Sequence, residues 1–359
     1  MTIPSERAAR TATLRIVAMA VLAVALGAAV YLQRGLIGDA ISQIGKLSML
    51  TIVGLVVLAT YERLSRAGIM RRMLGDVSLG RAVTIHDVGN AVSKGVPFGG
   101  ALGTALRWSI ARDSGVPTTR FATTLVAYGI ATTFASWLLP LIALLIDLTQ
   151  RPARLTDVAM LIGIVVVLVL SVVFWSVVLR SERLEGWASR QTRGVWARLA
   201  RRITACRSHD PASGIGAVRL ELLEMAKRPW WILTRTVAAQ ACGAVILLVA
   251  LRGVGVGDEL GATEFFRLFF LTHLLGTFAP TPGGIGVVEA GLTGALVAAG
   301  VTAPLALAGV VVYRLLTYVT PIVLGAVLYA VWSSRQARRL AVQAAEAALL
   351  PGPQRALNS

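Results

Sequence analysis

The sequence predicts an all-α polytopic membrane protein, with about six spanning helices and two re-entrant helical hairpins arranged as an inverted repeat. Hydrophobic residues make up 56% of the 359 residues, and the mean hydropathy is +0.72, which is too apolar for a soluble protein. Six uninterrupted apolar runs are long enough to cross a bilayer. Two further stretches are moderately apolar but contain Gly and Pro near their middles.

Each of the six runs is close to, or longer than, the roughly 20 residues that a helix needs to cross hydrocarbon. The first run follows arginines in the order of a signal peptide, but its length favours a retained helix. We therefore divide the chain into a cytoplasmic N-terminus (1–13), a membrane domain (14–335) and a partly disordered cytoplasmic tail (336–359). The runs cover residues 14–33, 42–61, 121–146, 157–179, 231–251 and 304–332.

The arginines predict the orientation, because positive charge beside membrane spans stays cytoplasmic. Arginine-rich segments lie before the first run and after the second ("ERLSRAGIMRRM"), the fourth and the last ("RQARRL"). The connections expected on the other side, "RGLIGDA", "DLTQRPARLTD" and "LRGVGVGDELGA", are short and mix both signs of charge. We expect a multi-pass protein of the cell membrane with both termini cytoplasmic.

The formal net charge of +17 follows from topology, because the basic residues lie mostly in segments between apolar runs, and the loop at 181–230 is long and basic. Its sequence is amphipathic, with Trp187 and Trp196 among arginines, which is typical of a helix lying on anionic lipid headgroups. We expect these headgroups as partners of the loop, and no nucleic acid.

The two interrupted stretches, 83–116 and 264–302, contain "KGVPFGGALG" and "APTPGGIG" and are expected to form hairpins. The alternating orientation requires each stretch to cross an even number of times. The first hairpin would then enter from the cytoplasm and the second from the outer face. The halves also match weakly in sequence: Gly99-Gly100 with Gly283-Gly284, Gly115-Val116 with Gly300-Val301, Tyr128 with Tyr313, and Thr132 with Thr317. Inverted repeats occur in secondary transporters, whose binding site lies between broken helices at the bilayer midplane.

The tip of the second hairpin combines helix-breaking residues: Pro280, Pro282, Gly283, Gly284 and Gly286. Irregular backbone within a bilayer is tolerated only where it is buried in protein or lines a hydrated cavity. The helix ends created there offer unpaired amides that suit a phosphate or carboxylate.

Several charged and polar residues could line such a cavity. Glu289 and Arg314 could form a structural ion pair, or Arg314, Arg107 and Arg112 could bind an anionic headgroup, and both could hold together. Polar residues also recur every four positions along 121–146, either as helix packing or as a cavity wall. These residues are Thr124, Tyr128, Thr132 and Ser136, with Tyr313 and Thr317 on the matching later helix.

No catalytic or metal-binding pattern stands out. Cys206 and Cys242 form neither a disulfide framework nor a metal cluster. The three histidines lack metal-ligand spacing, and we expect His273 to be the deeply buried one. The Gly255-x-Gly257-Asp258 pattern of intramembrane proteases has no second aspartate in an apolar run. We expect no cofactor and no enzymatic activity.

"PTPGGIGVVEAGL", "VPFGGALGTALRWSIARDSGV" and "VVYRLLTYVTP" resemble the transmembrane family of lysylphosphatidylglycerol synthase, also called the flippase-like domain family, over about residues 14–335. The resemblance implies paired re-entrant hairpins and movement of aminoacylated phosphatidylglycerol between leaflets. By motif it implies Pro282, Gly283, Gly284, Gly286, Glu289 and Arg314 as functional positions. A soluble aminoacyl-transferase domain is absent from this sequence, so we do not expect synthesis of aminoacylated lipid.

The resulting hypothesis is a lipid translocase that moves an anionic or aminoacylated phospholipid, or a lipid-linked precursor, between leaflets. The site would comprise Pro282, Gly283, Gly284, Gly286, Glu289, Arg314, Tyr313, Gly99, Gly100, Arg107, Arg112 and Tyr128. The alternatives are a membrane enzyme, or a regulatory scaffold, in cell-envelope lipid or glycan synthesis. A homo-oligomer, or a partner enzyme of the cell envelope, is compatible with each of these functions.

Overall fold

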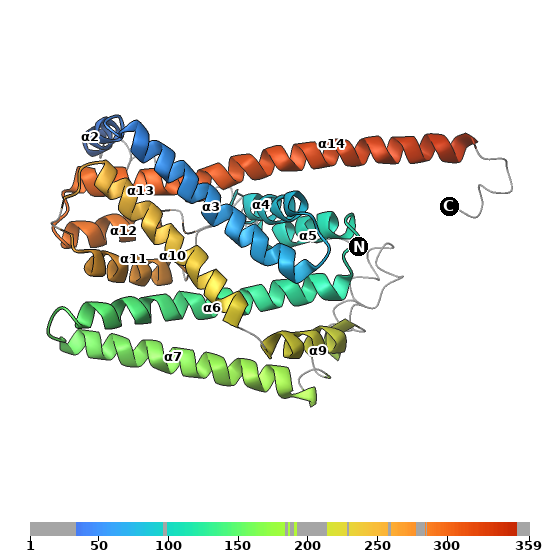
Figure 1. Ribbon diagram of the computed structural model, residues 1–359, viewed down its shortest axis with the longest axis horizontal. Helices are drawn as coiled ribbons and strands as arrows, with labels where there is room; N and C mark the ends of the chain where they lie inside the picture. The colour runs from blue at the N-terminus through green and yellow to red at the C-terminus, as the bar shows by residue number, and fades with distance from the viewer. Residues whose placement is uncertain are drawn as a thin grey trace, which may run out of the picture.

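The computed structural model describes residues 34–95, 99–183, 186, 190–191, 214–227, 230–257, 260–277, 284 and 286–349, and all regular structure within these residues is helical (Figure 1). Four described helices are long and apolar enough to cross a membrane, or five if the bent pair α2 and α3 counts as one span. The all-α polytopic fold is confirmed, and the predicted run at 14–33 lies outside the described residues. The elements are α2 (Arg34–Ile44), α3 (Met49–Leu74), α4 (Leu79–Gly95), α5 (Gly99–Arg112), α6 (Thr118–Leu148), α7 (Leu155–Arg180), α9 (Ile215–Ala226), α10 (Trp230–Gly253), α11 (Ala262–Thr277), α12 (Val287–Ala298), α13 (Ala303–Arg314), the π-helix η4 (Leu315–Val319) and α14 (Thr320–Leu349).

The predicted bounds of the second span are wrong. The segment "RGLIGDA", expected as a connection, is the first part of α2, and a bend of 93° separates α2 from α3. Ser48 starts α3 by accepting a hydrogen bond from the Thr51 amide at 3.1 Å. The helix then continues to Leu74, through charged residues that were assigned to a cytoplasmic flank. The helix can continue because two of these, Glu62 and Arg66, face an internal cavity instead of lipid.

Both predicted hairpins are present and enter from opposite ends of the molecule. Helices α4 and α5 pack on each other, as do α11 and α12. At the base of the first hairpin, Trp332 Nε1 of α14 donates to Asp113 Oδ2 at 3.3 Å. At the base of the second, Thr263 Oγ1 donates to Gln150 Oε1 at 3.0 Å, just beyond the end of α6. Helix α6, which has 31 residues and is therefore about 45 Å long, separates the two bases (Figure 1).

A buried ion cluster fixes the base of the second hairpin to the connection between α6 and α7. Arg267 Nε lies 2.9 Å from Asp147 Oδ2, and Arg151 bridges Asp147 and Asp157 at 2.7 Å from each. Hydrogen bonds to Asp157 and then Asp147 raise the pKa of the Arg151 guanidinium above its ordinary value. Because both carboxylates are buried, this pairing keeps the connection rigid where it leaves the apolar region.

The inverted repeat is visible in matching local geometry. Gly115 and Gly300 both have positive φ, 78° and 96°, which suits glycine at a helix C-terminus. The next residue of each donates back into the preceding helix, Val116 to Ala111 O at 3.1 Å and Val301 to Leu296 O at 3.0 Å. Each unit therefore consists of a hairpin, the same C-terminal turn and one following helix.

The repeat extends one helix further upstream than the sequence indicated. Helices α3 and α10 pack against each other and each leads into a hairpin. Both are followed by a glycine with positive φ, Gly75 at 93° and Gly255 at 103°. Sequence similarity between α3 and α10 is too low for this match to be predicted.

Glycines allow the first hairpin to pack closely. A Cβ at Gly325 of α14 would collide with Asp87 O and Ala91 Cβ of α4, whereas a Cβ at Gly129 of α6 would meet no atom within 4 Å. Small residues that let backbones approach are the usual basis of helix packing in membranes.

Gly325→Ala is expected to destabilise the protein by about 1–3 kcal/mol, because the helices must separate to admit the methyl group. Gly129→Ala, the matched control, should be neutral or stabilising by up to about 1 kcal/mol through helix propensity. Thermal unfolding in detergent measures both. Equal melting temperatures for the two variants would contradict the described packing of α14 on α4.

Two helices lie in or extend into the segments predicted to be cytoplasmic. Helix α9 lies within the predicted basic loop and packs on α6, with Leu222 buried. Helix α14 runs without a break past residue 335 to Leu349, so no structural boundary separates the membrane domain from the first part of the tail. Residues 192–213 and 350–359 lie outside the described residues, as do Trp187 and Trp196.

Candidate functional site

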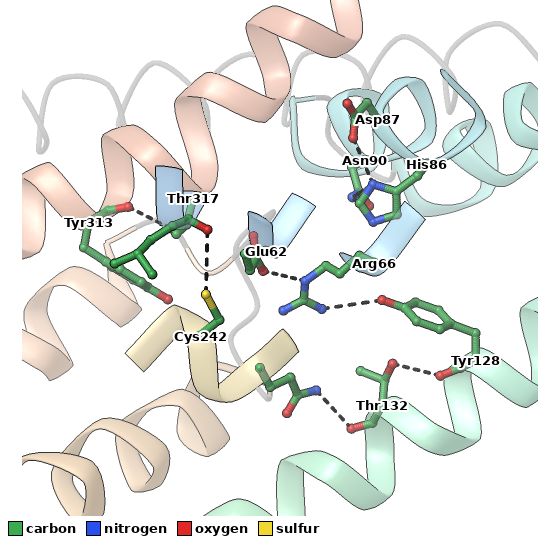
Figure 2. Close-up of polar contacts among 12 residues, drawn as sticks. Glu62, Arg66, His86, Asp87, Asn90, Tyr128, Thr132, Cys242, Tyr313 and Thr317 are labelled. Carbon is green, nitrogen blue, oxygen red and sulfur yellow. Dashed lines mark hydrogen bonds and ion pairs between the residues drawn. The ribbon is translucent and has the colours of Figure 1, made fainter. Parts of the chain in front are cut away.

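A central cavity of about 410 Å³ is lined by residues of both hairpins. Figure 2 shows side chains from α3, α4, α6, α10 and the end of α13 converging on this region. Residues from both hairpins line it, including Lys94 near the tip of the first and Val288 in the first turn of α12. The cavity is therefore enclosed by both halves of the repeat, as the sequence predicted.

The lining of the central cavity is strongly basic. Five of its residues are cationic and one is acidic, so the excess of positive charge favours an anionic ligand. Charge in a site partly shielded from water interacts more strongly than it does in bulk solvent. The cations are Arg63, Arg66, Lys94, Arg107 and Arg314, and the acid is Glu62.

Arg66 points into the middle of this region (Figure 2). Its Nε lies 2.5 Å from Glu62 Oε1, one helical turn earlier on α3, and its Nη1 lies 3.5 Å from the Tyr128 hydroxyl of α6. The contact with Tyr128 is at the limit of a hydrogen bond. The guanidinium is thus held in place by Glu62 and retains donors that can face a ligand.

A network of polar side chains connects the two helices of the first hairpin. Arg107 Nη2 donates to Asn90 Oδ1 at 2.7 Å, and Asn90 Nδ2 lies 3.1 Å from His86 Nε2. His86 Nδ1 lies 2.9 Å from Asp87, which also pairs with Arg63 at 3.4 Å. The Nε of Arg107 is buried and has no hydrogen-bond partner among the described residues. This network fixes Arg107 at the wall of the cavity.

At the tip of the second hairpin, Glu289 has two structural roles. Its Oε2 accepts a hydrogen bond from the Gly286 amide at 2.7 Å, which caps α12. Its Oε1 lies 2.5 Å from Arg314 Nε. Gly286 has φ of 82°, a conformation in which glycine is favoured. Arg314 lines the cavity whereas Glu289 does not, so the ion pair holds the guanidinium at the cavity wall.

The end of α4 in the first hairpin contacts the short π-helix η4, which follows Arg314. Lys94 Nζ donates to Thr317 O at 3.2 Å, and the Tyr318 hydroxyl donates to Lys94 O at 2.7 Å. The Arg314 guanidinium lies 4.6 Å from the centre of the Tyr318 ring. A π-helix frees backbone carbonyls, and such segments are frequent at functional sites.

The structure places the predicted site residues as follows. Tyr128, Tyr313, Arg107 and Arg314 line the cavity, together with Thr132, Ser136 and Thr317. In both repeats the threonine donates to the tyrosine carbonyl at 2.8 Å. Gly284 is buried with φ of 69°. Pro280, Pro282 and Gly283 lie outside the described residues.

Three predicted positions lie away from the cavity. Gly99 is buried against the backbone of Val92, where any side chain would collide, so it serves hairpin packing. Gly100 is exposed and a Cβ there would meet no atom within 4 Å. Arg112 is exposed at the end of α5. Arg112 faces away from the cavity because it follows Arg107 by five positions, about 140° around the helix.

Sequence analysis missed several lining residues: Glu62, Arg63, Arg66, His86, Asn90, Lys94, Gln240 and His273. The four-residue spacing of Glu62 and Arg66 was a signal that they share a helix face. Of the two histidines that the structure describes, His86 and not His273 is buried, since His273 is exposed toward the cavity and stacks on Phe269.

The described residues contain no group of three or more His, Cys, Asp or Glu side chains that could hold a metal ion. Cys242 is buried, and its thiol contacts Leu58 O at 3.7 Å. The site therefore has the chemistry of anion binding through guanidinium, ammonium and hydroxyl groups.

Fold and site together define a polytopic α-helical membrane protein with a basic internal cavity between two opposed hairpins. The sequence model described as "Lysylphosphatidylglycerol synthase TM region" matches residues 11–325. The chain belongs to this family, as the resemblance of its motifs indicated. No curated protein matches the chain significantly.

Proposed function

We propose that the protein moves a phospholipid with a phosphate-bearing headgroup, or a lipid-linked precursor, from one leaflet to the other. The observation that carries this proposal is the central cavity, in which five cationic side chains and one acidic side chain face each other between the two hairpins. The headgroup would enter the cavity while the acyl chains stay in lipid.

The placement of the cations supports this proposal. Arg66 comes from α3, Lys94 and Arg107 from the first hairpin, and Arg314 from the helix that the second hairpin contacts. Planar guanidinium groups match phosphate oxygens and can bind them with two parallel hydrogen bonds. A phosphate at the centre would therefore contact both halves of the repeat at once.

The inverted repeat supports alternating access. The hairpins enter from opposite ends. Lys94 of the first contacts η4, and Glu289 of the second pairs with Arg314 just before η4, so a small movement of either half would open the cavity toward one side. Among transporters, such rocking of one repeat against the other exposes a fixed site in turn. The translocation site in this proposal is the set of Arg66, Lys94, Arg107, Arg314, Tyr128 and Tyr313.

The proposal is tested by leaflet exchange in vesicles that contain the full chain. Fluorescent phosphatidylglycerol placed in both leaflets is quenched from outside by dithionite, and exchange extends quenching beyond the outer half. We expect faster exchange of phosphatidylglycerol than of phosphatidylcholine, and no exchange in vesicles with an unrelated multi-pass protein. Absence of exchange for every phosphate-bearing lipid tested would exclude this function.

A further inference from the structure

A second cavity, of about 450 Å³, lies at the base of the first hairpin and shares no lining residue with the central cavity. The beginning of α4, the residue after α5 and the last apolar turns of α14 enclose it. We call it the basal pocket. Its polar lining includes Arg81, Asp113, Trp332, Arg335, Gln336 and Arg339.

The basal pocket has three arginines and one carboxylate. Asp113, whose side chain is 18% exposed, lies 3.6 Å from Arg81 Nη1 and 3.8 Å from Arg339 Nη1. When the Gln336 amide is oriented so that its oxygen and its nitrogen both have suitable hydrogen-bond partners, the nitrogen donates to Asp113 Oδ1 at 3.1 Å. Charge-assisted hydrogen bonds between guanidinium and carboxylate are normally about 2.7–2.9 Å long. At these longer separations, Asp113 lies near Arg81 and Arg339 but leaves both with hydrogen-bond donors for a ligand.

Part of the lining of the basal pocket is apolar. Leu328 and Val331 of α14 line it, and the Trp332 ring lies beside them with its Nε1 directed to Asp113 Oδ2 at 3.3 Å. Tryptophan with one polar and one apolar side is enriched where a helix leaves the bilayer. Arg335 and Arg339 follow at one-turn spacing on the same helix. The pocket thus offers cations toward water and an apolar wall toward lipid.

The geometry points to the basal pocket as a binding site for the phosphate of an anionic phospholipid in the leaflet on this arginine-rich face. Arg81, Arg335 and Arg339 contact the phosphate, while the glycerol and upper acyl chains lie against Leu328 and Val331. A lipid held there bridges the base of the first hairpin and α14. This site is separate from the central cavity, and its existence does not depend on transport.

The site is tested by measuring how tightly the purified full chain in detergent retains phosphatidylglycerol, by native mass spectrometry across a lipid titration. The double variant Arg335→Gln, Arg339→Gln should bind one phosphatidylglycerol about 30-fold more weakly, at roughly 1 kcal/mol for each arginine near a membrane surface. Arg338→Gln is the matched control, because Arg338 is exposed on the same helix and does not line the pocket. Equal binding by the double variant and the control would overturn the proposal.

Two further arms identify the ligand and exclude misfolding. Asp113→Asn removes the competing carboxylate and should tighten phosphatidylglycerol binding several-fold, a gain that misfolding cannot produce; unchanged or weaker binding would count against the site. Inorganic phosphate at millimolar concentration should leave lipid retention unchanged, since it gains nothing from the apolar wall. Displacement by inorganic phosphate would overturn the lipid assignment.

Discussion

Arg66→Gln is expected to slow leaflet exchange of phosphatidylglycerol about 10- to 100-fold. A charge-assisted hydrogen bond to a phosphate contributes about 1.5–3 kcal/mol, and each 1.4 kcal/mol corresponds to a factor of ten. Arg66 is the cation whose donors lie between the halves of the repeat, and Glu62 and Tyr128 hold it there. The exchange assay in vesicles measures the effect, with lipid order and protein amount held constant.

The matched control for this prediction is Arg72→Gln. Arg72 lies on the same helix, is exposed and does not line the central cavity. The Arg72→Gln variant should exchange lipid at the wild-type rate. If the two variants exchange lipid equally fast, Arg66 does not contact the headgroup.

Loss of Arg66 also leaves Glu62 without its partner, so a second comparison separates the two effects. Glu62→Gln keeps Arg66 and releases it from its ion pair at 2.5 Å. We expect this variant to exchange phosphatidylglycerol as fast as the wild type or faster, because the guanidinium gains freedom to bind phosphate. A rate as low as that of Arg66→Gln would indicate that the pair acts only to maintain the structure.

The parts of the fold that sequence predicted are those in which composition and position have one physical explanation. Gly and Pro within apolar stretches interrupt helices wherever they occur, so both hairpins were predictable. The polar spacing that contains Tyr128 and Thr132 was also informative, since apolar helices rarely carry four-residue polar rows without a cavity or partner helix. Both residues line the central cavity.

The parts that sequence missed involve residues with two favourable environments. Arginine is stable at the cytoplasmic boundary and also in a hydrated cavity, so Arg63 and Arg66 were assigned to the flank of a span. Only the continuation of α3 to Leu74 distinguishes the two cases, and that depends on packing by distant helices. The sharp bend before α3 has the same origin, because Gly45 is compatible with either a turn or a helix end.

The role of Arg107 illustrates a further limit. Its partner Asn90 is 17 positions away on the other helix of the hairpin, and a Cβ at Gly89 would collide with the Arg107 stem. The sequence contains Arg107 and a glycine-rich hairpin, but the pairing depends on how the helices are rotated. Contacts between helices of a hairpin are therefore less predictable than residues on one helix face.

Glu289→Gln and Arg314→Gln are each expected to lower stability by about 2–4 kcal/mol, because each breaks an ion pair between largely buried side chains. The Arg314 and Glu289 side chains are 14% and 30% exposed, and their atoms lie 2.5 Å apart. The double variant should be little less stable than the worse single variant, since the first substitution already breaks the pair. Thermal unfolding of the wild type, the two single variants and the double variant gives the coupling free energy between Glu289 and Arg314 directly.

Leaflet exchange by the same four proteins resolves the two interpretations of this pair. Glu289 accepts from the Gly286 amide and does not line the cavity, whereas Arg314 lines it. If Arg314 binds the headgroup, Arg314→Gln and the double variant should both lose exchange, while Glu289→Gln should retain most of it at a temperature where it is folded. Exchange that follows stability alone, with the double variant as active as Glu289→Gln, would show that the pair only fastens the second hairpin to α13. Because the interpretations differ in the double variant, activity there separates an arginine that contacts lipid from one that only holds two helices together.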